Sequence, residues 1–258
     1  MSVHIEDNAT DEGQTCFKIS TPTATYFFQK EAGGFSSMLD ADGRDWLNFH
    51  PNPSPSYPAS GADAYRGMPN LVHGGEDDGV GHPGFRTCSS QQLSENVIES
   101  VSQSGNWRTR WTFLDDYAEL EVLEAADRSY WFLYEGTPGG RYAPQAQTWG
   151  NSADGARTDQ PDYVLGSAAY GVWQWAYVVS GERALLFVKQ GEPVQSTFSF
   201  LGNTEAGVTS PDGMVVLGLG RGEEVESYLR GPQRFRMSFV EADASLRDAV
   251  ETRARALL

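Results

Sequence analysis

Apolar and polar residues alternate along most of this chain, and this pattern predicts β-strands. In residues 107–113, apolar or β-branched side chains occupy every second position, with Arg108 and Arg110 between them. The residues expected on the buried face of this strand are Trp107, Thr109, Trp111 and Phe113. Similar runs of strand length, separated by turn-forming residues, continue from residue 16 to residue 241. The pattern therefore predicts an all-β fold of many antiparallel strands, either a sandwich or a barrel.

Only the last segment, residues 244–258, has the spacing of an amphipathic helix. Asp243 or Ser245 is suited to cap its first turn. The positions expected to be buried are Leu246, Ala249, Val250 and Leu257. We therefore expect one domain over residues 1–258 with a short C-terminal helix, and we expect the polar residues 1–12 to be frayed.

Two long stretches interrupt the strand pattern, residues 50–90 and residues 136–168, and both are rich in glycine, proline and aspartate. Loops of this length inside a compact domain are usually functional or disordered. The stretch "AYRGMPNLVHGGEDDGVGHPGFRTCSS", residues 64–90, holds two of the four histidines together with arginines and three consecutive acids. This content favours a functional loop, and we expect it to form one wall of a site.

The formal net charge of -16 and a pI near 4.5 exclude some partners. Such a field repels nucleic acid and anionic membrane surfaces, so we expect neither as a partner. No apolar run reaches the roughly 18 residues of a membrane span. The start, "MSVHIEDNATDEG", has no basic or apolar signal-peptide region. A cytoplasmic protein is expected, although a secreted chain without its leader would look the same. Cys16 and Cys88 are expected to be reduced, with one bridge left open.

Aromatic residues make up 12% of the chain, and seven of them are tryptophans. Aromatic faces stack on the C–H-rich faces of sugars. The candidates for a sugar-stacking floor are Trp149, Tyr170, Trp173 and Trp175, of which Trp173 and Trp175 are expected to share a face by alternation. Packing in the core is the alternative for all four.

Several polar residues are candidates for contacts with a sugar. Arg66 and Asn70 form a possible clamp, because a guanidinium donates a planar fork and an amide both donates and accepts. The alternative is loop scaffolding, with Arg66 in a surface ion pair. Arg221 follows an apolar strand and is expected at the rim of a sheet, facing the same cleft.

Other candidates are groups that can move protons. His73 and His82 titrate near neutrality, and Glu135 can act as a base if it is partly desolvated. Tyr134 and Glu135 end an apolar strand beside a long loop, where sites are often found. The alternatives are loop histidines and an ion pair at the end of the strand.

The acidic turn of Glu76, Asp77 and Asp78 contains enough oxygens for calcium. Its spacing is not that of an EF-hand, so we favour a solvated turn and expect neither a metal nor a cofactor.

Three segments resemble galactose mutarotase-like proteins: "GGFSSMLDADGRDWL", "YRGMPNL" and "WRTRWTF…AELEVLEA…YWFLYEG". The resemblance implies a large antiparallel β-supersandwich with a sugar site on its concave face. It also implies a mutarotase pair, a Glu that takes the proton from O1 and a His that protonates the ring oxygen. That His lies near mid-chain in such proteins, whereas no histidine follows His82 here. Tyr134, Tyr170 or an early histidine would have to replace it.

Three functions follow as hypotheses. The first is an enzyme similar to aldose epimerases, which moves protons on a saccharide. The second is a lyase on uronate-containing glycans, with a Tyr or His as base and an Arg that neutralises the carboxylate. The third is a non-catalytic sugar-binding module. The sequence leaves open which sugar binds and what the oligomeric state is.

Overall fold

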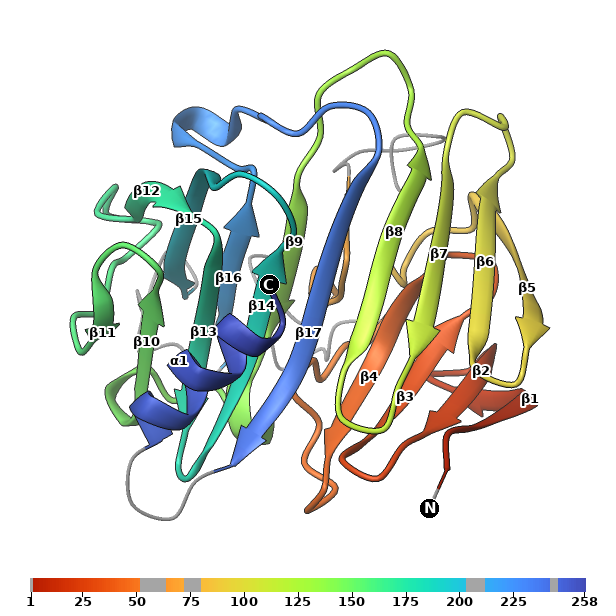
Figure 1. The fold of residues 1–258 in the computed structure, drawn as a ribbon, viewed down its shortest axis with the longest axis horizontal. Coiled ribbons are helices and arrows are strands. Elements are labelled where there is room, and N and C mark those ends of the chain that lie inside the picture. Colours follow the sequence, from red (N-terminus) through yellow and green to blue (C-terminus); the bar gives the residue numbers. More distant parts are fainter. Residues whose placement is uncertain (1, 52–63, 72–79, 203–211, 242–245) are drawn as a thin grey trace.

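The computed structural model describes residues 2–51, 64–71, 80–202, 212–241 and 246–258. In these residues the strands form three antiparallel sheets (Figure 1). The first sheet is built, in order, from β1 (His4–Asp11), β2 (Gln14–Ser20), β3 (Ala24–Gln29) and β4 (Gly34–Asp40). The second four-stranded sheet is built, in order, from β12 (Ala169–Trp173), β15 (Val194–Leu201), β16 (Met214–Leu219) and β9 (Phe132–Gly136).

A nine-stranded sheet spans the whole molecule, and the two smaller sheets lie behind its two halves in the view of Figure 1. Its order is β11 (Gly155–Arg157), β10 (Gln147–Asn151), β13 (Trp175–Ser180), β14 (Arg183–Lys189), β17 (Gln233–Glu241), β8 (Ala118–Glu124), β7 (Arg108–Phe113), β6 (Val97–Ser102) and β5 (Cys88–Ser94). The chain also has short 3-10 turns, η2 (Pro138–Gly140), η3 (Pro144–Ala146) and η4 (Glu223–Val225), and one helix, α1 (Leu246–Ala256). The predicted antiparallel supersandwich with a C-terminal helix is therefore confirmed.

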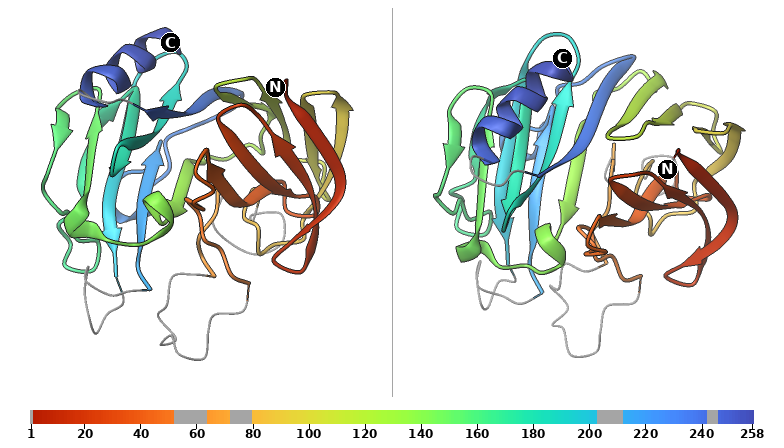
Figure 2. Two further views of the ribbon diagram at one scale, coloured as in Figure 1. Left: turned by 90° about the horizontal axis from the view of Figure 1, so that it is seen from below. Right: turned by 60° about the horizontal axis from the view of Figure 1, so that its bottom comes forward.

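The left view of Figure 2, seen from below, shows the two smaller sheets facing the large one. One apolar core is formed by side chains of all three sheets. Phe35 of β4 packs edge-on against Trp111 of β7, with 4.8 Å between the ring centroids. Phe132 of β9 stacks on Phe235 of β17 at 4.7 Å. Residues from all three sheets thus bury their aromatic faces together. The predicted buried face of residues 107–113 is confirmed, since Trp107, Thr109, Trp111 and Phe113 are all buried.

Helix α1 packs on the outer face of the large sheet, against β14 and β17 (Figure 1). Val250, Ala254 and Leu257 are buried there beside Trp175 and Tyr177. The helical spacing predicted Val250 and Leu257 correctly, and Leu246 and Ala249 pack partly buried against the same cluster. The predicted capping residues, Asp243 and Ser245, lie outside the described residues.

The structure differs from the predicted elements at three places. Residues 4–11 are not frayed but form β1, because the turn at Glu12 and Gly13 folds them back onto β2. The stretch 136–168 contains β10 and β11, which pair with each other and, through β10, with β13. Trp173 and Trp175, expected on one face of one strand, belong to two strands, because the chain passes from one sheet to another at Gln174.

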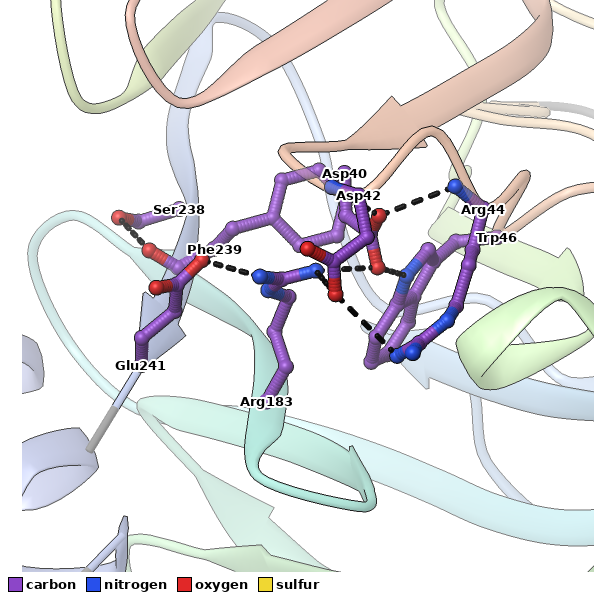
Figure 3. Close-up of polar contacts among 8 residues, drawn as sticks. All are labelled: Asp40, Asp42, Arg44, Trp46, Arg183, Ser238, Phe239 and Glu241. Atoms are coloured by element: carbon purple, nitrogen blue, oxygen red, sulfur yellow. Dashed lines mark hydrogen bonds and ion pairs between the residues drawn. The ribbon is translucent and has the colours of Figure 1, made fainter. Parts of the chain in front are cut away.

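An ion cluster with a buried centre, Arg183 and Asp40, joins the first sheet to the large sheet (Figure 3). The Arg183 guanidinium lies 2.6 Å from the Asp40 carboxylate and also pairs with Asp42 and Glu241. The Trp46 indole donates a hydrogen bond to Asp40 at 2.9 Å. Burial works to raise the pKa of Asp40, but hydrogen bonds from Trp46, the Arg44 backbone and Arg183 outweigh it and lower that pKa. We refer to Arg183, Asp40, Asp42 and Glu241 as the Arg183 cluster.

Both cysteines, Cys16 and Cys88, are buried and form no disulfide within the described residues, in agreement with the expected reduced state. No described helix is long and apolar enough to cross a membrane.

Candidate functional site

Residues 67–71 run antiparallel beside β9 and also contact β4, so this part of the predicted loop wall lies between the two smaller sheets. The backbones of Gly67 and Glu135 exchange hydrogen bonds of 2.8 and 3.0 Å. The Phe35 amide of β4 donates to the Met68 carbonyl at 2.8 Å. Asn70 follows at a left-handed φ of 35°, a conformation that asparagine tolerates better than most residues. The segment therefore holds Asn70 next to the end of β9.

Alternation in β9 sends its side chains to opposite faces of the sheet. Phe132 and Tyr134 point into the core, where the Tyr134 hydroxyl donates to the Trp46 carbonyl at 2.6 Å. Leu133 and Glu135 point to the other side. Leu133 packs there with Met214 and Val216 of β16 in a separate apolar cluster. We call this second side of the sheet, with Leu133, Glu135, Val216, Ser199 and Tyr170, the site face. Tyr134 does not lie on it.

Glu135 is the central titratable group of the site face. Its side chain is almost completely buried, and the Asn70 amide donates to its Oε2 atom at 2.8 Å. Burial raises the pKa of Glu135 from 4.5 to about 7, while the Asn70 hydrogen bond and the charge of Arg221 act in the opposite direction. Within the described residues, no hydrogen bond to the Oε1 atom is present. Glu135 can therefore accept or release a proton near neutral pH.

Arg221 lies across the site face rather than outward from the rim. Its aliphatic stem covers Gly218, where a Cβ atom would come within 2.8 Å of the Arg221 Cβ atom. The Thr197 hydroxyl donates to the Arg221 carbonyl at 2.6 Å and fixes the backbone there. The guanidinium lies 5.8 Å from the ring centroid of Trp131 and 5.3 Å from that of Tyr163, both within cation–π range. Its positive charge acts to lower the pKa values of both Glu135 and Tyr170, so we treat the three groups as one site.

Buried polar atoms without a partner gather around these residues. The register of the sheet puts Val216 opposite Glu135 and Ser199 opposite Val216, so Glu135 and Ser199 lie in one row across three strands. The Ser199 hydroxyl, the Asn70 Oδ1 atom and the Trp131 indole nitrogen are buried and have no hydrogen-bond partner among the described residues. Such groups are rare in native interiors, so three of them around Glu135 and Arg221 distinguish this region from the rest of the core.

Tyr170 is on β12, the edge strand of the same sheet, directly opposite Thr197. It therefore shares the site face with Thr197 and is partly exposed. Burial raises the pKa of its phenol, and the charge of Arg221 opposes this effect. The phenol is protonated at neutral pH and can donate a hydrogen bond or a proton.

Arg66 and His82 are buried and held by backbone atoms. The Arg66 guanidinium donates to the carbonyls of Asn48 at 2.8 Å and Gly213 at 3.0 Å, so it ties together loops far apart in sequence. The His82 Nδ1 atom accepts from the Gly84 amide at 3.0 Å, and its Nε2 atom lies 3.2 Å from the Tyr65 carbonyl. This pattern fits a neutral ring protonated at Nε2. These hydrogen bonds anchor loops, and neither Arg66 nor His82 is one of the residues that form the site face.

The predicted aromatic floor is divided between two faces. Trp149 and Trp173 are buried in the core, where Trp149 stacks on Phe198 at 4.3 Å. Trp175 packs under α1 in the other cluster, so it does not share a face with Trp173 as alternation predicted. The reason is the change of sheet at Gln174. Of the predicted aromatic residues, Tyr170 alone lies on the site face.

His73 and the acidic turn of Glu76, Asp77 and Asp78 lie outside the described residues. Within the described part of the chain, no group of three or more His, Cys, Asp or Glu side chains could hold a metal ion.

The polar and aromatic residues of the site that were not predicted are Trp131, Tyr163, Thr197 and Ser199. Trp131 comes directly before β9. It lies an even number of positions along the chain from Glu135, so strand alternation puts both side chains on the same side of the sheet. That signal was available in the sequence. Tyr163 reaches the site because residues 161–163 bond to Phe200, a contact that no local pattern indicates.

Comparison with known proteins identifies the fold. No protein-family model matches the chain, and no curated protein matches it by sequence. Solved structures do match. A galactose mutarotase-like protein from Lactobacillus casei has a TM-score of 0.53 at 8% identity, over 87% of this chain and 99% of that one. A galactose mutarotase related enzyme from Lactobacillus acidophilus has the same TM-score and identity, over 89% and 99%.

A third match is a longer enzyme, an alpha-N-acetylgalactosaminidase from Bifidobacterium bifidum. Its TM-score is 0.52 at 12% identity, over 93% of this chain and 38% of that one. The chain therefore has the galactose mutarotase-like fold. At these identities the comparisons establish the fold alone.

Proposed function

We propose that the site face binds a saccharide and that Glu135 moves a proton on it, in the manner of an aldose epimerase. The observation that carries the proposal is the buried Glu135 carboxyl, with a pKa of about 7, oriented by Asn70 on a mutarotase-like fold. A general base is most effective when its pKa lies near the working pH. Glu135 satisfies this condition because burial raises its pKa.

The proposed chemistry interconverts anomers through the open-chain sugar. The Glu135 carboxylate takes the proton from the anomeric hydroxyl, and the bond between C1 and the ring oxygen breaks. The ring oxygen receives a proton from the Tyr170 phenol, which takes the place of the histidine expected from the family resemblance. Rotation about the C1–C2 bond and reversal of both proton transfers give the other anomer. Asn70 orients the carboxyl and leaves its Oε1 atom for the substrate.

The test is the rate at which a panel of fresh α-anomers equilibrates, followed by polarimetry or proton NMR. Glu135→Gln should lower the enzymatic rate by about 10²- to 10⁴-fold, the usual contribution of a general acid or base. Glu99→Gln is the matched control, because Glu99 is also buried but pairs with Arg110 on β6 and β7. It should keep the wild-type rate.

Melting temperatures of both variants distinguish loss of chemistry from loss of fold. A wild-type protein that accelerates no anomerisation, or a Glu135→Gln variant at full rate, would contradict the proposed reaction. Sugar binding without turnover would instead favour a non-catalytic binding module.

A further inference from the structure

Three arginines are buried in the described chain, and they differ in what holds them: Arg66, Arg183 and Arg221. Arg183 pairs with three carboxylates, and Arg66 donates to backbone carbonyls. No carboxylate among the described residues lies within ion-pair distance of Arg221. Within the described residues, the guanidinium donates one hydrogen bond, a long one of 3.5 Å to the Tyr163 hydroxyl. A buried charge without such a partner is unusual in proteins.

The surroundings of Arg221 position its guanidinium without using its donors. Gly218 makes room for the stem, Thr197 holds the backbone, and the Trp131 and Tyr163 rings lie beside the charge. Aromatic faces stabilise a guanidinium but do not accept its N–H bonds as a carboxylate does. The planar fork of donors is therefore left for another group, and it fits the two oxygens of a carboxylate or a phosphate.

The charge balance of the site points the same way. The chain as a whole carries a formal charge of -16, yet the carboxyl closest to Arg221 in this argument, Glu135, is about half neutral at pH 7. The charge of a second acid, Glu223, acts on Tyr170. The pair of Arg221 and Glu135 therefore carries a net positive charge at pH 7 within an acidic protein. This charge favours a ligand with a negative group beside Arg221.

We infer that Arg221 binds the anionic group of the sugar, so that the ligand is a saccharide bearing a carboxylate or a phosphate. This inference rests on the proposed sugar site and specifies its ligand class. The anion lies on the Arg221 fork between Trp131 and Tyr163, and the sugar ring extends along the site face toward Glu135. Arg221 is then a binding residue that selects charged over neutral sugars.

The test compares binding of D-glucose, D-glucuronate and D-glucose 6-phosphate by calorimetry or ligand-observed NMR. At least one charged sugar should bind the wild type roughly 10- to 100-fold more tightly than glucose, the range expected for charge-assisted hydrogen bonds. The charged sugar that binds better identifies the anion. Equal binding of all three, or binding of none, overturns the inference without the need for any variant.

The variant Arg221→Gln should remove the preference, and Arg221→Met, which keeps an apolar stem over Gly218, should do the same if the Gln variant folds poorly. The matched control is Arg157→Gln, since Arg157 also lies over a tryptophan, 4.9 Å from the Trp149 centroid, but pairs with Asp154 and Asp159. It should keep the preference. An Arg221→Gln variant that still prefers the charged sugar overturns the inference.

The two proposals fail separately. If charged sugars bind through Arg221 but no anomer interconverts, the proposed reaction fails and the ligand class stands. If neutral sugars interconvert through Glu135 and Arg221→Gln changes no affinity, the reaction stands and the ligand class fails.

Discussion

The Arg183 cluster and the site face each bury an arginine near a carboxyl group, but the pKa of that carboxyl is shifted in opposite directions in the two regions. Asp40 lies 2.6 Å from Arg183 and its pKa is lowered. Glu135 has no ion pair with Arg221, and burial raises its pKa to about 7. Paired charges in the first region stabilise the contact between two sheets (Figure 3). Groups in the second region are desolvated but not satisfied, which is typical of sites that bind or react.

The difference shows that burial alone does not identify a functional charge. Arg66, Arg183 and Arg221 are all buried to a similar degree, and sequence reasoning selected the first and the third for the same site. The informative property is what each guanidinium donates to. Substitutions that separate these two kinds of charge should therefore have different consequences for stability and for binding.

The largest expected effect is on stability at the Arg183 cluster. Arg183→Met leaves Asp40 buried without its cation, and breaking a buried pair in this way typically costs about 3–5 kcal/mol. The free energy of unfolding in urea measures it. Arg157→Gln, which removes an exposed pair, should cost less than about 1 kcal/mol. A loss at Arg183 no larger than that of the control would show that the cluster is not structural.

The pH dependence of the same cluster follows from the direction of the Asp40 shift. A carboxyl with a lowered folded-state pKa stabilises the fold above its unfolded pKa, and this contribution is lost as the pH falls through the folded pKa. The difference in unfolding free energy between wild type and Arg183→Met should therefore shrink in acid.

Glu135 should show the opposite dependence. Between pH 4.5 and about 7 the folded chain retains a proton on Glu135 that the unfolded chain has released. The unfolding free energy therefore falls as the pH rises through this window, by up to about 3 kcal/mol. Glu135→Gln removes this penalty, so it should be more stable than wild type at pH 8 and similar to it below pH 4.5. Thermal melts at several pH values measure the difference, and a constant difference would contradict the raised pKa.

Much of the fold could be predicted because its signals are local. Period two in residues 107–113 and helical spacing in residues 244–258 depend only on neighbouring residues, and both were confirmed. The change of sheet at Gln174 could not be predicted, since Trp173 and Trp175 are apolar on either side of it and alternation continues without a break. Residues 4–11 form a strand through pairing with β2, although their composition is polar.

The site was harder to predict because its assignment depends on distant contacts. Period two separates Tyr134 from Glu135, but only the packed structure shows which of them faces the core. Arg66 is held by the carbonyl of Gly213, which is 147 residues away, and nothing near Arg66 indicates this. Asn70 and Glu135, 65 residues apart, were both candidates from residue type alone, and the structure places them in contact.

Gly218→Ala sharpens the comparison by moving Arg221 without removing it. A Cβ atom there would come within 2.8 Å of Arg221 and 3.3 Å of Leu133, so the guanidinium stem must shift, at a stability cost of about 1–3 kcal/mol. Because Arg221 lowers the pKa of Glu135, that pKa should rise when the charge moves away. Carbon-13 NMR titration of the glutamate carboxyls measures it. An unchanged titration of Glu135 would mean that Arg221 does not act on it.

The smallest effect is expected at Ser199, where the two kinds of buried polar group can be compared on one strand. The Ser199 hydroxyl lies on the site face and has no partner in the described part of the chain. The Ser196 hydroxyl points to the other side of β15 and donates to the Val194 carbonyl at 2.8 Å. Ser196→Ala should lower the unfolding free energy by about 1 kcal/mol and leave sugar affinity unchanged.

Ser199→Ala removes an unsatisfied group, so it should leave the unfolding free energy unchanged or raise it by up to about 1 kcal/mol. If Ser199 meets a sugar hydroxyl, the same variant should bind that sugar roughly 2- to 10-fold more weakly, as expected for one neutral hydrogen bond. Urea denaturation and calorimetry on both variants make the comparison, and a Ser199→Ala protein that is destabilised with unchanged affinity would assign this hydroxyl to the fold rather than to the site.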